Sequence, residues 1–221
     1  MKIGIVVATK RELEALFDVF GHPLMYSVSS YMIYSWRPMP NKEIYAVLSG
    51  VGEIAAAAST QYLIDEYQVN MIINYGVVGG LVDYEDKKPF LVDRVVHYDF
   101  DMTFDTDLKV GQYPESDVFI EPEQSAFLSS ELVGIDRLAC ASADKIVGGG
   151  EPKKRLRREF KAEACDMESA GILITCNRNR IPCTIIKAIS DGLNEDVEAF
   201  ERNADEAARN CVELINRLIH K

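Results

Sequence analysis

A strand-like run near the carboxyl end of the chain constrains the fold more than any other feature. Residues 183–189 read Cys-Thr-Ile-Ile-Lys-Ala-Ile, a mostly apolar and β-branched sequence that predicts a buried strand. Ser190 and Asp191 follow directly at its carboxyl end. Ligands bind beyond the carboxyl ends of strands in open α/β sheets, so these two polar residues are candidates for a site.

A second stretch places two carboxylates at a similar position. Asp166 and Glu168 flank Met167 where a short extended piece turns into the apolar helix predicted for 169–176. Taken singly, Glu168 is typical of a helix N-terminus, where the helix dipole stabilises an acid. Asp191, taken singly, is typical of a loop or cap residue. The two matched positions together favour a shared crevice.

Length and charge bound the class of protein. The chain of 221 residues suits one domain with a sizeable core, and no repeat, low-complexity tract or linker divides it. We therefore expect a single domain over 1–221. The formal net charge of −11 argues against nucleic acid or an anionic membrane as partner, because both reward basic surfaces. The basic cluster within 153–158 is predicted to lie on the solvated face of a helix.

The remaining composition favours a cytoplasmic protein without metal or cofactor. No apolar run approaches the ~18–20 residues that cross a bilayer, and the apolar start, 1–7, reads as a strand and is too short for a signal-peptide core. The five cysteines stand in apolar segments without CxxC spacing, which favours buried free thiols over disulfides or zinc. For His97, next to a long predicted loop, a structural role is favoured over substrate contact.

The order of predicted elements indicates an α/β fold. Periodicity predicts strands at 2–8, 26–36, 43–49, 71–74, 91–96, 138–143 and 183–189, and helices at 10–20, 54–67, 155–160, 169–176 and 197–220. A long irregular loop is expected over 97–121, and loops of that length are usually functional or disordered. We predict a three-layer α/β/α domain with a central twisted mixed sheet flanked by helices on both faces.

Three further features stand at predicted strand ends. Glu12 falls in the first turn of the first helix, where a carboxylate is comfortable but also able to face a ligand. Glycines 50 and 52, and the glycine-rich stretch 76–80, follow strands and permit close approach of the backbone to a ligand. The pattern is not GxGxxG, so a dinucleotide site is not indicated.

With these residues in hand, the chain resembles the superfamily of purine nucleoside and uridine phosphorylases, and within it the bacterial 5′-methylthioadenosine/S-adenosylhomocysteine nucleosidases. The resemblance runs nearly end to end and has its motifs in the same order. They are Met1-Lys-Ile-Gly-Ile followed by Glu12, Ser49-Gly-Val-Gly-Glu-Ile-Ala-Ala-Ala, Asn74-Tyr-Gly-Val-Val-Gly-Gly-Leu, Tyr98-Asp-Phe-Asp-Met-Thr, Gly111-Gln-Tyr-Pro114, Ser142-Ala-Asp144, Asp166-Met-Glu-Ser-Ala and Ala188-Ile-Ser-Asp191.

The resemblance implies hydrolysis of the N-glycosidic bond of an adenine nucleoside, with two catalytic residues. Asp191 would protonate or hydrogen-bond N7 of the departing purine, and Glu12 would take a proton from the attacking water. Such a division of labour suits a reaction that passes through an oxocarbenium-like sugar. An aspartate at 191 favours adenine over 6-oxopurines.

The resemblance also implies substrate-binding positions and a homodimer. Glu168 would grip the ribose hydroxyls with Met167 packed on the sugar, Ser190 would hold Asp191, and aliphatic residues after Asp144 would contact adenine. The full set of expected binding residues is Val51, Val77, Val78, Gly79, Ile146, Val147, Asp166, Met167, Glu168, Lys187 and Ser190. The loop 104–114 and the glycine-turn helices would form the dimer interface near the site.

Two residues depart from the family pattern and keep other functions open. Val77 stands where the family has serine or threonine, and Lys187 stands where it has arginine, which loses the planar fork of the guanidinium. Phosphorolysis is the first alternative, although a phosphate dianion needs arginines that are not found beside the glycine turns. The second alternative is a member that binds an adenine nucleoside without cleaving it. The 5′-substituent stays open between methylthio, homocysteinyl, deoxy and hydroxyl.

Overall fold

A computed structural model gives the arrangement of residues 1–28, 30–85, 87–123, 132–195 and 197–220. Its strands are β1 (Lys2–Val7), β2 (Leu24–Val28), β3 (Tyr31–Met39), β4 (Lys42–Leu48), β5 (Met71–Gly80), β6 (Phe90–His97), β7 (Arg137–Ser142), β8 (Ala164–Asp166) and β9 (Cys183–Asp191). Its helices are α1 (Lys10–Phe20), α2 (Glu53–Tyr67), α3 (Glu151–Phe160), α4 (Ser169–Asn179) and α5 (Val197–Ile219).

The strands form one mixed sheet in the order β2-β3-β4-β1-β5-β8-β7-β6-β9, with a further pairing of β5 with β9. Strand β1 runs parallel to β4 and β5, and β5 runs parallel to β9. Because β5 also meets β8 through its last two residues, the five strands from β5 to β9 close on themselves. The carboxyl ends of β1, β5 and β9 therefore lie at the same edge.

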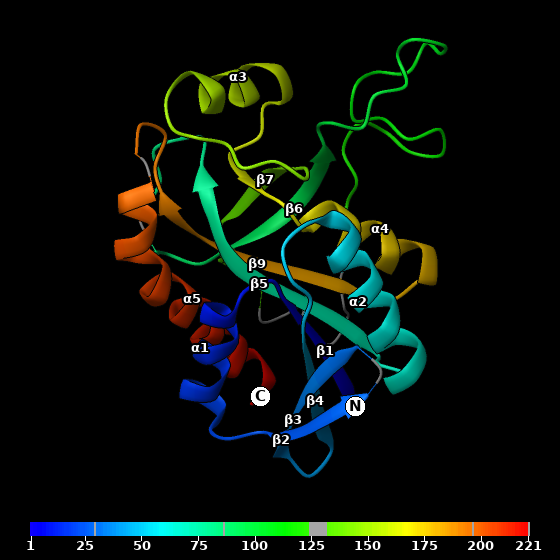
Figure 1. Ribbon diagram of the computed structural model, residues 1–221, viewed down its shortest axis with the longest axis vertical. Helices are drawn as coiled ribbons and strands as arrows, with labels where there is room; N and C mark the ends of the chain where they lie inside the picture. Colours follow the sequence, from blue (N-terminus) through cyan, green and yellow to red (C-terminus); the bar gives the residue numbers. More distant parts are fainter. Residues whose placement is uncertain (29, 86, 124–131, 196, 221) are drawn as a thin grey trace.

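Helices cover the sheet in two layers, with α1 and α5 on one side and α2 and α4 on the other (Figure 1). Alternation along β1 explains the arrangement: Ile3, Ile5 and Val7 pack with α1 and α5, whereas Val6 packs into the cluster that holds α2 and α4. Gly4 leaves room on this second side, because a Cβ there would lie 2.6 Å from Cδ1 of Ile72. The predicted three-layer α/β/α architecture is confirmed.

Two predicted strand boundaries are wrong. The segment 26–36 is not one strand but parts of the antiparallel hairpin β2–β3, in which Val28 pairs with Tyr31. The sequence between them lacks the glycine, proline or asparagine that signals a tight turn. Strand β5 does not stop at Asn74 but continues through the glycines to Gly80. These glycines are strand residues that make room for other side chains.

The other predicted elements agree with the structure to within a few residues, and all five cysteines are free and buried. The segment between β6 and Ile120 is irregular apart from one bridge between Val95 and Ile120, and it extends from the body of the molecule in Figure 1. His97 contacts Asp99 and Tyr113 at the base of this loop. Among the described residues, no helix has the length and apolar character to cross a membrane.

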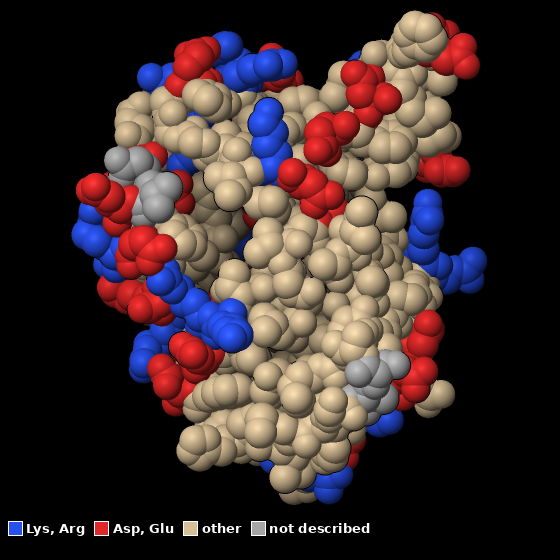
Figure 2. Space-filling view, viewed as in Figure 1, with Lys and Arg blue, Asp and Glu red and all other residues tan. Residues whose placement is uncertain are grey.

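Charges of both signs are mixed over the helices of the face in Figure 2, along α5 and around α3. Residues of α3 account for several of them, since Arg155 pairs with Glu159 and Arg158 with Glu151. The prediction that the basic cluster at 153–158 faces solvent is correct for these arginines. It is wrong for Lys153, whose side chain is 0% exposed.

Candidate active site

A cavity of about 410 Å³ opens at the edge where β1, β5 and β9 end. Strand ends, the start of α5 and the loop after β7 all contribute to its wall. The lining residues are Ala8, Thr9, Glu12, Val51, Val77, Val78, Gly79, Lys145, Ile146, Val147, Gly148, Gly149, Cys165, Asp166, Met167, Glu168, Ser190, Asp191, Glu195, Phe200 and Glu201.

The structure brings together almost every residue that the sequence predicted for the site. Both predicted catalytic residues and all but one of the predicted binding residues line this cavity. The exception is Lys187, which lies buried beneath the wall and pairs with Asp166. His97 is absent from the lining, in keeping with the structural role expected for it.

Glu12 is held by the loop between β1 and α1. Thr9 caps α1, and its hydroxyl and backbone N–H, with the N–H of Ala8, all donate to Oε2 of Glu12. From the described residues, the other oxygen, Oε1, accepts only the backbone N–H of Val77, at 3.2 Å. One carboxylate oxygen is therefore saturated and the second retains a free lone pair for a further donor such as water.

Gly76 is needed for this placement of Glu12. A Cβ on Gly76 would lie 2.3 Å from Oε1 of Glu12. The glycine-rich stretch of β5 thus lets a carboxylate, rather than a ligand, approach the backbone here.

Asp166 and Lys187 form a buried ion pair under the cavity, with 2.9 Å between Oδ2 and Nζ. Burial alone would raise the pKa of Asp166, but Lys187 and the hydroxyls of Ser142 and Ser169 lower it below its ordinary value. Burial alone would lower the pKa of Lys187, and the neighbouring carboxylates raise it. Both groups are therefore charged at neutral pH, and Lys187 supplies a positive charge beneath the acidic wall.

Ser142 explains how a third acid fits into this cluster. Its Oγ lies within hydrogen-bond distance of Glu53 and of Asp166 and accepts the N–H of Ala170. A hydroxyl has one proton, so it cannot donate to two carboxylates. Burial raises the pKa of Glu53 to about 8, and the charge of Asp166 adds to this. Glu53 is thus protonated at neutral pH and donates to Ser142, which donates to Asp166.

Glu168 lies at the junction of β8 and α4 and points to the N-terminus of α2. Its Oε1 accepts the backbone N–H of Gly52 at 3.1 Å, and Gly52 has a φ of 106° that favours glycine. Burial raises the pKa of Glu168 to about 7, and Asp166 contributes further. A buried carboxyl group whose pKa lies near neutral pH is typical of functional sites.

Asp191 ends β9, and each of its carboxylate oxygens accepts one hydrogen bond from a side chain and keeps a second lone pair. Oδ1 accepts the hydroxyl of Ser190 at 2.8 Å, and Oδ2 lies 2.6 Å from Nζ of Lys153. Burial raises the pKa of Asp191, although Lys153 and Ser190 act in the opposite direction. The side chain is 17% exposed and lines the cavity, so it is reachable from there.

The rest of the wall is mainly aliphatic. Val77, Val78, Val147 and Met167 line the cavity, and so does Ile146, which is largely exposed. Sequence reasoning did not select Thr9, Cys165, Glu195, Phe200 or Glu201 as lining residues. Of these five residues, only Phe200 could have been suspected from the sequence, because it is an aromatic residue in the first turn of the helix that follows Asp191.

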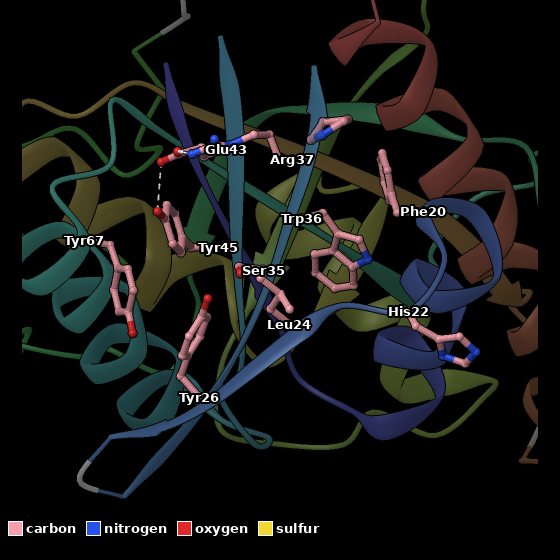
Figure 3. A pocket seen from close by; sticks show the side chains of 11 residues that line it. Phe20, His22, Leu24, Tyr26, Ser35, Trp36, Arg37, Glu43, Tyr45 and Tyr67 are labelled. Carbon is pink, nitrogen blue, oxygen red and sulfur yellow. Dashed lines mark hydrogen bonds and ion pairs between the residues drawn. The ribbon is translucent and has the colours of Figure 1, made fainter. Parts of the chain in front are cut away.

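A second and larger hollow of about 830 Å³ lies at the other end of the sheet, beside the β2–β3 hairpin. Figure 3 shows Trp36 and Phe20 on one side of it and Tyr45, Tyr26 and Tyr67 on the other. Its charged residues, Arg37 and Glu43, pair with each other near the surface. It contains none of the residues predicted for the site.

The family model of the phosphorylase superfamily matches residues 2–220, so this chain belongs to that superfamily. It is 29% identical over 227 residues to the aminodeoxyfutalosine nucleosidase of Helicobacter pylori strain ATCC 700392 / 26695, covering 99% of this chain and 97% of that one. It is also 29% identical to the 5′-methylthioadenosine/S-adenosylhomocysteine nucleosidase of Staphylococcus haemolyticus, with 98% of each chain covered.

Solved structures give the same result. The Helicobacter pylori 5′-methylthioadenosine/S-adenosylhomocysteine nucleosidase superposes with a TM-score of 0.89 at 26% identity, over 100% of this chain and 98% of that one. The futalosine hydrolase of Helicobacter pylori superposes with a TM-score of 0.88 at 26% identity, over 100% and 97%. The resemblance predicted from the motifs is confirmed, and these relatives are nucleosidases.

Proposed function

We propose that this protein hydrolyses the N-glycosidic bond of an adenine nucleoside and releases adenine. The substrate would be of the 5′-methylthioadenosine, S-adenosylhomocysteine or 5′-deoxyadenosine type. The observation that carries the proposal is one cavity in which Glu12, with a free lone pair, and the protonatable Asp191 both reach the wall. The activities of the relatives named above support it.

The two residues divide the work of the reaction between them. Asp191 gives its proton to N7 of the purine as the bond from C1′ to N9 breaks, and the bonding electrons leave with the base. Glu12 takes a proton from a water molecule, whose oxygen bonds to C1′ of the oxocarbenium-like sugar. The products are adenine and a ribose derivative with a hydroxyl at C1′.

Glu168 and the aliphatic wall bind the substrate in this scheme. An ionised Glu168 accepts hydrogen bonds from the 2′- and 3′-hydroxyls of ribose, while Met167 packs against the sugar. Val147 and Ile146 contact the adenine plane. Holding the ribose in this way spends binding energy on orientation for the transition state.

Water is a better nucleophile than phosphate for this cavity. Acidic residues dominate the charges on its wall, and Lys145 is the one basic residue among the described residues that line it. The buried Lys187 is already paired with Asp166. A phosphate dianion would meet Glu12 and Glu168 without an arginine to bind it.

We also propose that the chain works as a homodimer of a single domain spanning 1–221, in the cytoplasm. Exposed apolar side chains support an interface: Val51, which lines the cavity, Ile54 in the first turn of α2, and Met102 and the fully exposed Phe104 in the loop after β6. A second copy seated there would bring its own loop to the mouth of the cavity. The buried free thiols fit a reducing compartment.

A product assay tests the function. The purified protein is incubated with 5′-methylthioadenosine, S-adenosylhomocysteine, 5′-deoxyadenosine, adenosine and inosine, each with and without phosphate. Adenine release that does not depend on phosphate is expected, with inosine left intact. Strict dependence on phosphate would indicate a phosphorylase. Binding without release would indicate that Val77 and Lys187 mark a non-catalytic member.

A further inference from the structure

Lys153 is the one residue of the charged helix α3 that turns its ammonium group into the protein. Its neighbours Lys154 and Arg155 are exposed, whereas its own side chain is 0% exposed. Nζ donates to Oδ2 of Asp191 at 2.6 Å, to the carbonyl of Asp191 at 3.0 Å and to the carbonyl of Gly192 at 2.8 Å. All three ammonium protons are therefore used, and the cation is fixed at the end of β9.

The surrounding backbone is shaped for this side chain. Gly79 of β5 lies opposite, and a Cβ there would be 3.2 Å from Cε and 3.3 Å from Nζ of Lys153. Leu156, one turn later on α3, is buried beside it in the helix's inward face. The N–H of Gly150, at the N-cap of α3, donates to the carbonyl of Leu193 and joins the helix to the turn that follows Asp191.

Among the described residues, few other ionisable groups approach the pair of Lys153 and Asp191. Glu195 accepts the N–H of Gly192 in the turn before α5, and Cys165 comes from β8. Lys145 and Glu201 stand elsewhere on the cavity wall. Burial raises the pKa of the Cys165 thiol to about 12, so it stays neutral, and Lys153 is the positive charge in contact with Asp191.

Burying an ammonium group only for packing is costly, because the desolvation penalty of the buried charge can exceed the attraction to its partner. Next to Asp191 it has a chemical use. When Asp191 gives up its proton, a carboxylate forms in a half-buried place, and an adjacent cation stabilises that charge. The same contact fixes Oδ2, which leaves Oδ1, on the Ser190 side, to meet the purine.

We propose that Lys153 is a positioning residue for the reaction, which fixes the Asp191 carboxyl and compensates the charge that appears on it when its proton passes to the leaving purine. This rests on the proposed function. Lys153 stays an ammonium ion throughout: the proton moves from Asp191 to N7, and Asp191 regains one from solvent after adenine leaves.

Lys153→Met tests the proposal, with Lys154→Met as the matched control on the exposed face of the same helix. In Lys153→Met, kcat is expected to fall by about tenfold to a hundredfold while KM changes little. This loss is part of the rate enhancement that general acid catalysis contributes. Because Lys153 opposes the rise in the pKa of Asp191, its loss should move the basic limb of the pH profile of kcat/KM upward by about one unit or more. Lys154→Met should match the unaltered protein in both.

Two further measurements separate a chemical role from a structural one. Lys153→Gln keeps a donor but loses the charge, so it should show the same shift of the basic limb with a smaller loss of kcat. Thermal unfolding of each variant gives the folded fraction by which kcat is corrected. A basic limb that stays in place in folded Lys153→Met and Lys153→Gln would overturn the proposal.

Failure of the proposed function would be seen separately, in the unaltered protein. If that protein binds adenine without cleaving nucleosides, the pH at which adenine binding is half lost replaces the kinetic profile. Lys153→Met should again shift this midpoint upward and Lys154→Met should not. If neither Lys153→Met nor Lys153→Gln folds, Lys153→Ala is measured with and without ethylamine, and a lack of activity or binding rescue by the amine would count against the proposal.

Discussion

The hollow beside the β2–β3 hairpin and the cavity at the strand ends differ in the protonation state of their carboxylates. Beside the β2–β3 hairpin, Glu43 has a lowered pKa because it accepts a hydrogen bond from Tyr45 and another from Arg37 in contact with solvent. In the cavity at the strand ends, burial raises the pKa of Glu168 to about 7. The first carboxylate is simply ionised, whereas the second lies close to a balance between its two protonation states at neutral pH.

Volume alone would select the wrong hollow as the active site, since the hairpin hollow has about twice the volume of the other. Its wall is aromatic, and its one ion pair lies near the surface, where such pairs contribute little. The smaller cavity collects Glu12, Glu168 and Asp191 from three separate segments of the chain and has two buried lysines behind them. Costly groups that converge on one cavity are better evidence of a site than volume is.

Asp191→Asn should have the largest effect on activity. An amide is the same size but cannot give a proton to N7, so kcat for adenine release should fall by about a thousandfold or more, within the usual range for general acid catalysis. The matched control is Arg37→Gln in the hairpin hollow, which should leave kcat unchanged. A normal kcat in Asp191→Asn would contradict the assignment of the smaller cavity as the active site.

Glu12→Gln should come next. The amide cannot take a proton from water, and kcat should fall by about a hundredfold to a thousandfold while the affinity for an adenine nucleoside is retained. Isothermal titration of the variant with 5′-methylthioadenosine measures the affinity. Loss of binding together with activity would mean that Glu12 holds substrate and does not act as a base.

Trp36→Ala extends the comparison to stability. Trp36 packs against Phe17 and Phe20, and its indole N–H donates to the carbonyl of Gly21 at 2.8 Å. Truncation should lower the free energy of unfolding by about 3 to 5 kcal/mol, as for other buried aromatic residues. The folded variant should keep the kcat of the unaltered protein. A specific fall in kcat would assign a functional role to the hairpin hollow.

Glu53→Gln should change how stability depends on pH. The pKa of Glu53 in the folded state is about 8, above the value near 4.5 of an unfolded glutamate. Its contribution to stability is therefore full below pH 4.5 and is lost as the pH rises through 8. A glutamine can still accept from Gly171 and donate to Ser142, so this loss should disappear.

The variant and the unaltered protein should have similar stability near pH 5, and the variant should be more stable by about 2 to 4 kcal/mol near pH 9. Glu168 remains in both proteins and keeps part of the slope, because its raised pKa has the same sign. Urea unfolding at the two pH values measures the difference. Parallel curves would mean that Glu53 is ionised in the folded protein.

The sequence contained enough to predict the fold and most of the cavity wall. Acids that follow strands must meet if those strands are parallel neighbours, which is how Glu12 and Asp191 could be grouped although they are far apart in the chain. The motifs of the superfamily added Val51 and Val147, which have no chemical signal of their own.

Residues whose role depends on a distant partner were beyond such reasoning. Lys153 lies in a run of basic residues and has the pattern of a solvated face, and only the approach of Gly79 and Asp191 shows where it points. Gly76 signals close approach correctly, but the neighbour is Glu12 and not a ligand. The β2–β3 hairpin was missed because the sequence between its strands has serines, which signal a turn more weakly, and no glycine, proline, asparagine or aspartate.

The most direct test of the central claim is a crystal structure of Asp191→Asn with 5′-methylthioadenosine bound. We expect the nucleoside in the cavity at the strand ends, with N7 within hydrogen-bond distance of residue 191, the ribose hydroxyls on Glu168 and a water molecule between Glu12 and C1′. A nucleoside bound between Trp36 and Tyr45 in the hairpin hollow, with the other cavity empty, would contradict it.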